Sequence, residues 1–302
     1  MEVEKLLKRM NYCGPIDHTS IDILNELCLS FVSTIPYETL DNFAEKKRAT
    51  RPYDLKVTFN RIVNEHRGGN CLELNMTLEW MLEKLGYNVS RYMGYGYDVE
   101  NDCFGHDRHH VILLVTFEDG MTWLTDVGWN GASFVLPLLM HVPTLEQSQP
   151  SGIYKVAKYD DGYYVVEKRW HNQVDEEKQI IKHNQKDNEA LSRYQTSKDW
   201  MVIYGFKLET KPMEEFEKAF VLSQEKHPFT TSNCLAILQD RYHRRFMNGY
   251  TFVKKIYVNS MMIQVEKRKC ENSELIEILR SEFGINLGYK LQPKTDLPLN
   301  VA

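Results

Sequence analysis

The cysteine best suited to covalent chemistry is Cys71, because of the residues around it. They form the run Arg67-Gly68-Gly69-Asn70-Cys71-Leu72-Glu73-Leu74-Asn75. The two glycines allow a sharp turn and a close backbone approach to a ligand. Asn70 can cap a helix, and Glu73 stands at the third helical position, as in a capping box. Cys71 is therefore expected in the first turn of a helix, where the positive dipole end favours a thiolate.

A thiolate nucleophile needs a base, and the base needs a group that orients it. His110 directly precedes the apolar stretch 111–115, which reads as a strand, and residues 121–124 read as a second strand after a turn. Asp126 lies just past that second strand. Because hairpin pairing places the strands side by side, the sequence predicts Cys71 as nucleophile, His110 as base at a strand end, and Asp126 as the orienting carboxylate.

Other chemistry has to be weighed at the same residues. His109 adjoins His110, and the pattern alone does not choose between them. Cys103, His106, His109 and His110 have the side chains of zinc ligands, but a run so crowded rarely forms a tetrahedron without a second cluster, so no metal is expected. The run Gly94-Tyr95-Gly96 lacks the third glycine of a dinucleotide fingerprint, and the sequence holds no phosphate-binding loop.

The elements that must position these residues follow from the hydrophobic period. Residues 1–86 have helical spacing and include the helix that would carry Cys71; residues 87–204 have strand patterns, and 205–302 mix both. A polar stretch near 168–200 predicts a long surface insertion in the middle unit. Helices first, strands second and mixed elements last indicate an α+β fold of three units.

Composition narrows the class of partner and the compartment. The formal net charge is −5, which gives no reason to expect nucleic acid or an anionic membrane. The N-terminal residues lack the apolar core of a signal peptide, and no stretch is long enough to span a membrane. The six cysteines are spread without a CxxC pair, as suits reduced thiols. A cytoplasmic protein that acts on small molecules is expected.

At these residues the chain resembles the arylamine N-acetyltransferase family. That family has Arg-Gly-Gly-x-Cys at its nucleophile, then a histidine opening an apolar strand, then Asp-x-Gly; here these are 67–71, His110 with 111–114, and 126–128. The resemblance favours His110 over His109. It implies a helical bundle over 1–86, a β-barrel over 87–204 and an α/β lid over 205–302, with the Cys, His and Asp arranged as in cysteine proteases.

Further segments extend the resemblance over nearly the whole chain. Residues 35–40 resemble the family segment whose glutamate pairs with the motif arginine, which implies that Glu38 braces Arg67. Residues 229–232 and 283–288 resemble segments near the acyl-donor site. The residues thereby implied to contact substrate or coenzyme A are Tyr37, Leu72, Tyr95, Trp129, Ser133, Thr230, Thr231 and Asn286.

The activity implied by the resemblance is acetyl transfer from acetyl-CoA to an aromatic amine or hydrazine through acetyl-Cys71. Acetyl-CoA would be a co-substrate, no cofactor would be bound permanently, and a monomer is expected. Two departures touch substrate choice, because Asn70 stands where the family usually has an aromatic residue and Trp129 where small residues are commoner. Three alternatives stay open: a papain- or transglutaminase-like thiol enzyme, a non-catalytic relative, and transfer of a different acyl group.

Overall fold

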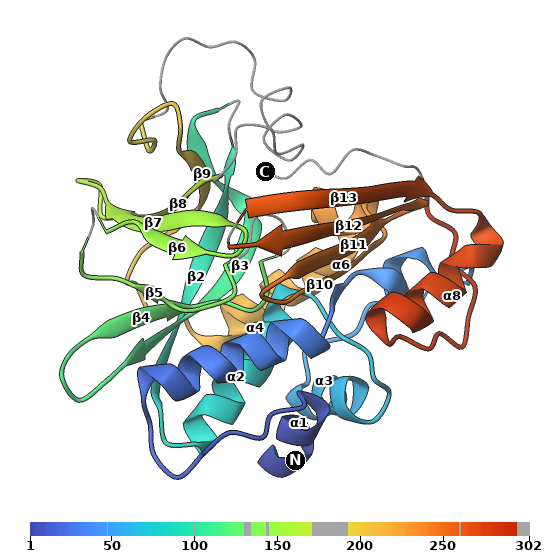
Figure 1. The fold of residues 1–302 in the computed structure, drawn as a ribbon, viewed down its shortest axis with the longest axis horizontal. Helices are drawn as coiled ribbons and strands as arrows, with labels where there is room; N and C mark the ends of the chain where they lie inside the picture. Colours follow the sequence, from blue (N-terminus) through green and yellow to red (C-terminus); the bar gives the residue numbers. More distant parts are fainter. Residues whose placement is uncertain are drawn as a thin grey trace.

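A computed structural model describes residues 1–46, 48–98, 101–129, 134–142, 145–170, 193–259 and 261–294. Helices gather at one side of the molecule, a strongly curved sheet rises beside them, and a second sheet with its own helix completes the fold (Figure 1). This is the three-part α+β architecture that the order of periods predicts. The site depends on where the three parts meet.

The N-terminal helices form where apolar residues recur at helical spacing and a polar side chain caps the start. Ser20, Asp54 and Asn70 each accept a hydrogen bond from the first turn of the helix they precede. The helices bury one continuous apolar core. Their bounds are α1 Val3–Arg9, α2 Ile21–Thr34, the 3₁₀ helix η1 Leu40–Phe43, α3 Leu55–Val63 and α4 Cys71–Lys84.

The curved sheet is antiparallel throughout and forms the barrel. Its strand order is β5-β4-β3-β2-β9-β8-β7-β6, so the late strand β9 pairs with β2 and joins the two hairpin groups. The bounds are β2 Asn88–Asp98, β3 Cys103–Thr116, β4 Thr122–Thr125, β5 Leu138–Leu139, β6 Gln147–Gln149, β7 Gly152–Lys158, β8 Tyr164–Arg169 and β9 Met201–Phe206.

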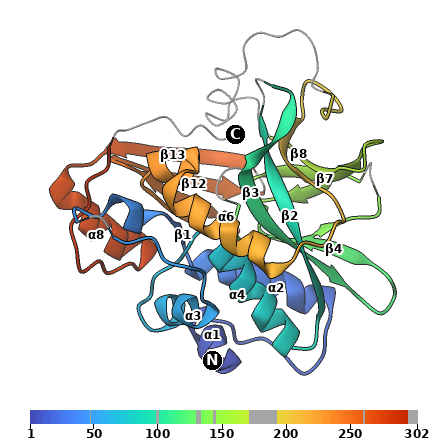
Figure 2. The ribbon, with the colours of Figure 1, turned by 180° about the vertical axis from the view of Figure 1, so that it is seen from behind.

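The lid is a second antiparallel sheet, ordered β1-β10-β11-β12-β13, with α8 packed on it. Its first strand, β1, comes from the N-terminal part, which ties that part to the lid. Helix α6 leads from the barrel to the lid and lies across the back of the molecule beside α4 (Figure 2). The bounds are β1 Tyr37–Glu38, α6 Met213–Glu225, α7 Pro228–Ser232, β10 Leu235–Gln239, β11 His243–Asn248, β12 Thr251–Val258, β13 Met261–Lys269 and α8 Asn272–Phe283.

Three details differ from the sequence-based expectation. His110 lies inside β3, not at the start of a strand, because pairing with β2 extends the strand back to Cys103. Lys168 was expected on a polar surface insertion, but it is fully buried in β8. The sequence does not predict strand β13, since both of its faces are largely exposed and only 263–266 alternate apolar with polar residues. Trp170, Tyr194 and Trp200 of the predicted insertion, which is centred on 168–200, are buried as well, and its residues 171–192 lie outside the described residues.

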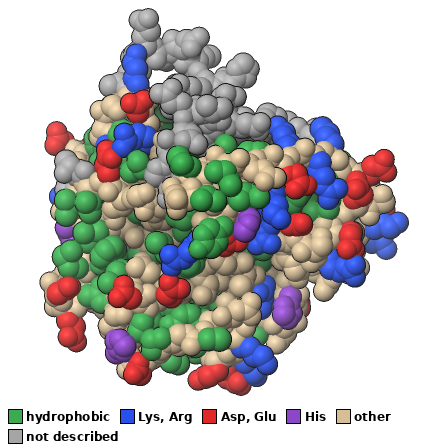
Figure 3. All heavy atoms as spheres, viewed as in Figure 1, with side chains coloured by type: hydrophobic (Ala, Val, Ile, Leu, Met, Phe, Trp, Pro, Cys, Tyr) green, Lys and Arg blue, Asp and Glu red, His purple; other side chains and the backbone are tan. Residues whose placement is uncertain are grey.

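The surface agrees with the near-balanced charge. Acidic and basic side chains are interspersed on the face shown in Figure 3, without a large area of one sign. Within the described ranges, every helix is too short or too polar to cross a bilayer. The unit boundaries at 86 and 204 stay predictions.

Candidate active site

Cys71 occupies the first turn of α4, as the capping pattern predicts. Asn70 Oδ1 accepts hydrogen bonds from the N–H groups of Leu72 and Glu73, at 3.1 and 3.2 Å. In return, Glu73 Oε2 accepts from the Asn70 N–H at 3.1 Å, which completes a capping box. The sulfur-bearing residue is half-buried and stands at the end of a packed helix. A nucleophile on such an element is held in place.

His110 and Asp126 are brought together by the hairpin of β3 and β4. His110 Nε2 lies 2.6 Å from Asp126 Oδ2, and both side chains are almost fully buried. The sulfur of Cys71 interacts with the same imidazole ring. Since Nε2 faces the carboxylate, Nδ1 is the nitrogen that remains for the sulfur. The structure thus places Cys71, His110 and Asp126 in one chain of contacts.

The electrostatics of this cluster favour a charged imidazole. Burial alone lowers the pKa of His110, but the Asp126 carboxylate and the Cys71 sulfur outweigh it and raise that pKa to about 10. Burial raises the pKa of Asp126, but the charge of His110 and hydrogen bonds from Asn75 and Gly128 lower it overall. The cluster therefore favours the charged form of His110 beside the ionised Asp126 carboxylate.

Asn75, which the sequence reasoning passed over, links the helix to the carboxylate. Its Nδ2 donates to Asp126 Oδ1 at 2.9 Å and to the Val111 carbonyl at 2.5 Å. Its Oδ1 accepts from the Val127 N–H at 2.9 Å. Asn75 lies four residues after Cys71 and hence on the same helix face, which is the signal that could have identified it.

The Asp126 loop approaches α4 closely at Gly128. A Cβ at this position would lie 2.7 Å from the Cys71 Cα and 2.9 Å from the Cys71 carbonyl oxygen. The Gly128 N–H also donates to Asp126 Oδ1 at 2.8 Å. Glycine at the third position of Asp-x-Gly therefore lets the loop lie directly against the nucleophile's backbone.

Aromatic side chains cover the imidazole. Trp129 meets His110 edge to face, with ring centroids 4.8 Å apart, and Tyr204 of β9 lies 5.3 Å from the same ring. Burial and the nearby Asp126 carboxylate raise the pKa of Tyr204 well above its ordinary value, so its phenol stays neutral. Tyr204 was not predicted, because only the pairing of β9 with β2 brings it here.

Arg67, just before the two glycines, is held by two carboxylates. Its guanidinium contacts Glu38 at 2.8 Å through Nε and Asp41 at 3.0 Å through Nη2. Arg61 of α3 contacts the same acids, and Tyr289 donates to Asp41. The Glu38–Arg67 contact is the one implied by the resemblance; Asp41, Arg61 and Tyr289 are additions that the sequence did not reveal.

Comparison with known proteins places the chain in a family. A family model described as N-acetyltransferase matches residues 20–292. The chain belongs to the arylamine N-acetyltransferase family. Its members are transferases, and the predicted family and enzyme class are both confirmed.

Individual members of the arylamine N-acetyltransferase family match along their full length. The chain is 26% identical over 296 residues to the pineal gland isozyme NAT-3 of Gallus gallus, covering 97% of each. The solved arylamine N-acetyltransferase of Salmonella typhimurium superposes with a TM-score of 0.75 at 20% identity, covering 97% of this chain and 94% of that one. The Mycobacterium marinum enzyme, solved in complex with CoA, gives 0.74 at 21% identity, with 94% and 93% covered. The predicted fold class is confirmed.

The residues that the arylamine N-acetyltransferase resemblance implied for binding are spread through the site and beyond it. Tyr37 and Leu72 are buried in core clusters, and Tyr95 packs beside His109 at 5.8 Å between ring centroids. Thr230 lines a polar pocket, and Thr231 donates to the His227 carbonyl. Asn286 is exposed, and Ser133 lies outside the described residues.

The described part of the chain gives the zinc alternative no geometric support. Among the side chains that the structure describes, no three His, Cys, Asp or Glu groups are placed to hold a metal ion. His110 is engaged with Asp126, and His109 points to the opposite face of β3, as neighbours on a strand do. The side chain of His106 is outside the described set.

Proposed function

We propose that this chain transfers an acetyl group from acetyl-CoA to an aromatic amine or hydrazine by a double displacement. The Cys71 thiolate attacks the thioester carbonyl, the carbon–sulfur bond to CoA breaks, and the His110 imidazolium gives its proton to the departing CoA thiolate. The amine then attacks acetyl-Cys71, and neutral His110 takes the amine proton as the cysteine thiolate leaves. The cycle thus regenerates the Cys71 thiolate and the His110 imidazolium.

The observation that carries this proposal is the buried contact of His110 with Asp126, 2.6 Å long, on the ring that interacts with the sulfur. A carboxylate in this position holds one tautomer and stabilises the imidazolium without being protonated itself. The lowered pKa of Asp126 is consistent with that role. Acid–base catalysis by such a histidine contributes about 10²–10⁴-fold.

A tetrahedral intermediate needs donors for its oxyanion, and the Cys71 N–H is the candidate on this chain. The Asn70 side chain occupies the N–H groups of Leu72 and Glu73, so the Cys71 N–H is the first-turn donor that these bonds leave. One such donor is worth about 2.7–4 kcal/mol of barrier. The second donor stays unassigned.

Aromatic acceptors fit both the chemistry and the walls of the site. An arylamine is neutral at pH 7 and can attack directly, whereas an alkylamine is mostly protonated. Trp129 and Tyr204, 4.9 Å apart between ring centroids, provide aromatic surface beside His110. We infer that Trp129 limits the size of the acceptor, with Leu72, Tyr37 and Tyr95 contributing less directly because they pack into apolar clusters.

Acetyl-CoA is the donor that the family membership supports best, and the solved complex of the Mycobacterium marinum relative with CoA is consistent with it. We propose that Thr230, Thr231 and Asn286 contact the coenzyme, that no cofactor is bound permanently, and that the chain acts as a cytoplasmic monomer. Propionyl- or malonyl-CoA remain alternative donors, to be compared in the same assay.

Intact-mass measurement after incubation with acetyl-CoA tests the proposal. The wild type should gain one acetyl group and lose it when an arylamine is added, and Cys71→Ser should gain none. A chain that takes no acetyl group but cleaves or crosslinks peptides would be a thiol enzyme of another class. A chain that binds CoA without any turnover would be the non-catalytic relative.

A further inference from the structure

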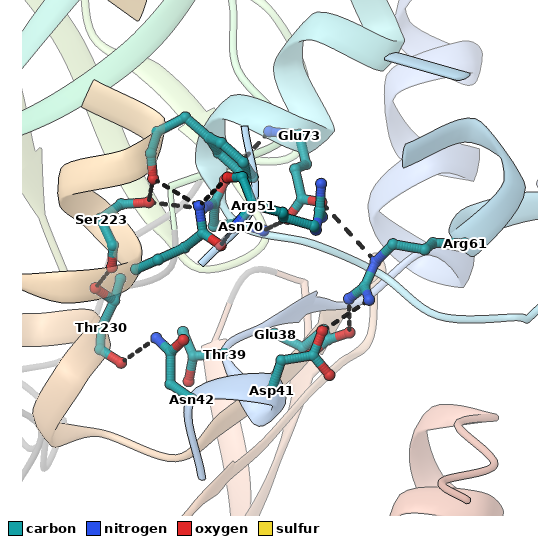
Figure 4. A pocket seen from close by; sticks show the side chains of 12 residues that line it. Glu38, Thr39, Asp41, Asn42, Arg51, Arg61, Asn70, Glu73, Ser223 and Thr230 are labelled. Carbon is teal, nitrogen blue, oxygen red and sulfur yellow. Dashed lines mark hydrogen bonds and ion pairs between the residues drawn. The ribbon is translucent and has the colours of Figure 1, made fainter. Parts of the chain in front are cut away.

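A hydrogen bond from Asn70 connects helix α6 to the turn that carries Cys71. Asn70 Nδ2 donates to Ser223 Oγ at 2.9 Å, across 153 positions of sequence (Figure 4). Its Oδ1 caps α4 through the N–H groups of Leu72 and Glu73. We infer that Asn70 is a positioning residue for the nucleophile, and that its bond to Ser223 sets where the Cys71 turn stands relative to α6.

Both ends of this bond are buried. Asn70 is 8% exposed and Ser223 6% exposed. The Ser223 hydroxyl donates its own proton to the Phe220 carbonyl at 2.7 Å, so its oxygen is left to accept from Asn70. The loss of such a partner from a buried amide is costly unless another polar group or a water takes its place.

Gln224, the next residue of α6, holds the backbone at Arg51 close to the same turn. Gln224 Nε2 donates to the Arg51 carbonyl at 2.8 Å, and Gln224 Oε1 accepts from the Arg51 N–H at 3.2 Å. The Arg51 guanidinium in turn donates to Glu73, the partner of Asn70 in the capping box. The first turn of α4 is therefore connected to α6 twice. Asn70 bonds Ser223 directly, and Glu73 is linked to Gln224 through Arg51.

The Asn70–Ser223 hydrogen bond bears on the reactivity of Cys71 because α6 connects the barrel to the lid. This helix runs from β9 of the barrel to the lid, and its Phe216 and Phe220 share a core cluster with Leu72 and Met76 of α4. Asn70, Ser223 and Glu73 line a polar pocket of about 40 Å³ between these elements. A loosened turn would move the sulfur relative to the imidazole, and a displacement of about 1 Å can cost about 10²-fold in rate.

Two substitutions distinguish the Asn70–Ser223 hydrogen bond from the capping of α4 by Asn70. Asn70→Ser keeps a good capping oxygen but is too short to reach α6, and Ser223→Ala removes the acceptor while leaving the cap intact. The double variant completes a cycle. Ser281→Ala on α8 is the matched control, because its hydroxyl also bonds a carbonyl of its own helix, Glu277 at 2.9 Å, but lies on the surface.

The decisive readout is the rate of Cys71 alkylation by iodoacetamide from about pH 5 to about pH 9, followed by peptide mass spectrometry with the exposed Cys13 as internal reference. Both single variants should react about tenfold more slowly at neutral pH, with the midpoint of the profile moved upward, and kcat/KM for acetyl transfer should fall by a similar factor. The double variant should be no worse than either single one.

The inference is overturned if both single variants keep the wild-type alkylation profile, even with a lower Tm, since Asn70 would then only stabilise the fold. Additive losses in the double variant would also overturn it, because the two side chains would be acting separately. The effect on kcat/KM rests on the proposed function, but alkylation needs no acyl donor. If the variants show the shifted alkylation but the wild type takes up no acetyl group, the proposed function fails and the positioning role stands.

Discussion

A histidine that keeps its proton above neutral pH links the chemistry of the site to the stability of the fold. His110 is buried, yet its pKa is raised from 6.5 to about 10, because Asp126 and the Cys71 sulfur face its two ring nitrogens. In the unfolded chain these partners are gone. Between the two values the native state holds a proton that the unfolded state has released, so unfolding becomes easier as the pH rises.

The expected outcome concerns His110→Gln. Below about pH 6.5 the wild type should keep the full stabilisation from this ion pair, and it should lose stability relative to the variant as the pH approaches 10, by at most about 1.4 kcal/mol per pH unit. Urea unfolding of both proteins at several pH values between these limits measures the difference. His109→Gln, the same change one position earlier, is the control. A difference that stays flat over this range would show that His110 is neutral in the resting protein.

At the scale of elements, the site depends on how closely the loop after β4 lies against α4. Gly128→Ala would place a Cβ 2.7 Å from the Cys71 Cα and 2.9 Å from Asn75 Nδ2, the amide that donates to Asp126. We expect kcat/KM for acetyl transfer to fall by about 10²-fold or more, with the fold retained by circular dichroism. Gly94→Ala is the matched control, because its Cβ would meet Ile112 and His110 at ordinary distances of 3.5–3.6 Å. Near-wild-type activity of Gly128→Ala would mean that the loop can move without consequence.

The same scale explains what the sequence could and could not predict. Local patterns suffice for α4, whose cap places Cys71, and for the β3–β4 hairpin, whose turn brings His110 to Asp126. Tyr204 could not be found this way, because β9 reaches β2 only after more than one intervening hairpin, and no local period encodes that pairing. The Asn70 tie to Ser223 likewise depends on long-range packing, which capping rules do not reveal.

At the scale of the whole molecule, a largely buried charge network joins the segments at 38–41, 51, 61 and 67 to the first turn of α4. Its members are three acidic side chains and three arginines, namely Glu38, Asp41, Glu73, Arg51, Arg61 and Arg67, and the exposed Arg48 also contacts Asp41 at 3.4 Å. Asp41 is where the C-terminal segment joins, through the hydroxyl of Tyr289. The Arg67 and Arg61 charges and hydrogen bonds from Tyr289 and Arg67 outweigh the effect of burial and hold the pKa of Asp41 well below its usual range. Its carboxylate is thus charged throughout the neutral range.

Asp41→Asn should unbalance this network from a single position. The side chains of Arg61 and Arg67 are only 10% and 5% exposed, so losing one of their carboxylates leaves positive charge poorly compensated. Because Asp41 itself is 26% exposed, we expect a loss of about 1–3 kcal/mol in the free energy of unfolding, below the value for a fully buried pair. Urea unfolding measures it, and Asp119→Asn in the exposed β3–β4 turn is the control. Equal stability of the two variants would show that the network holds Arg67 without Asp41, and that the C-terminal segment is not coupled to the nucleophile's turn through this carboxylate.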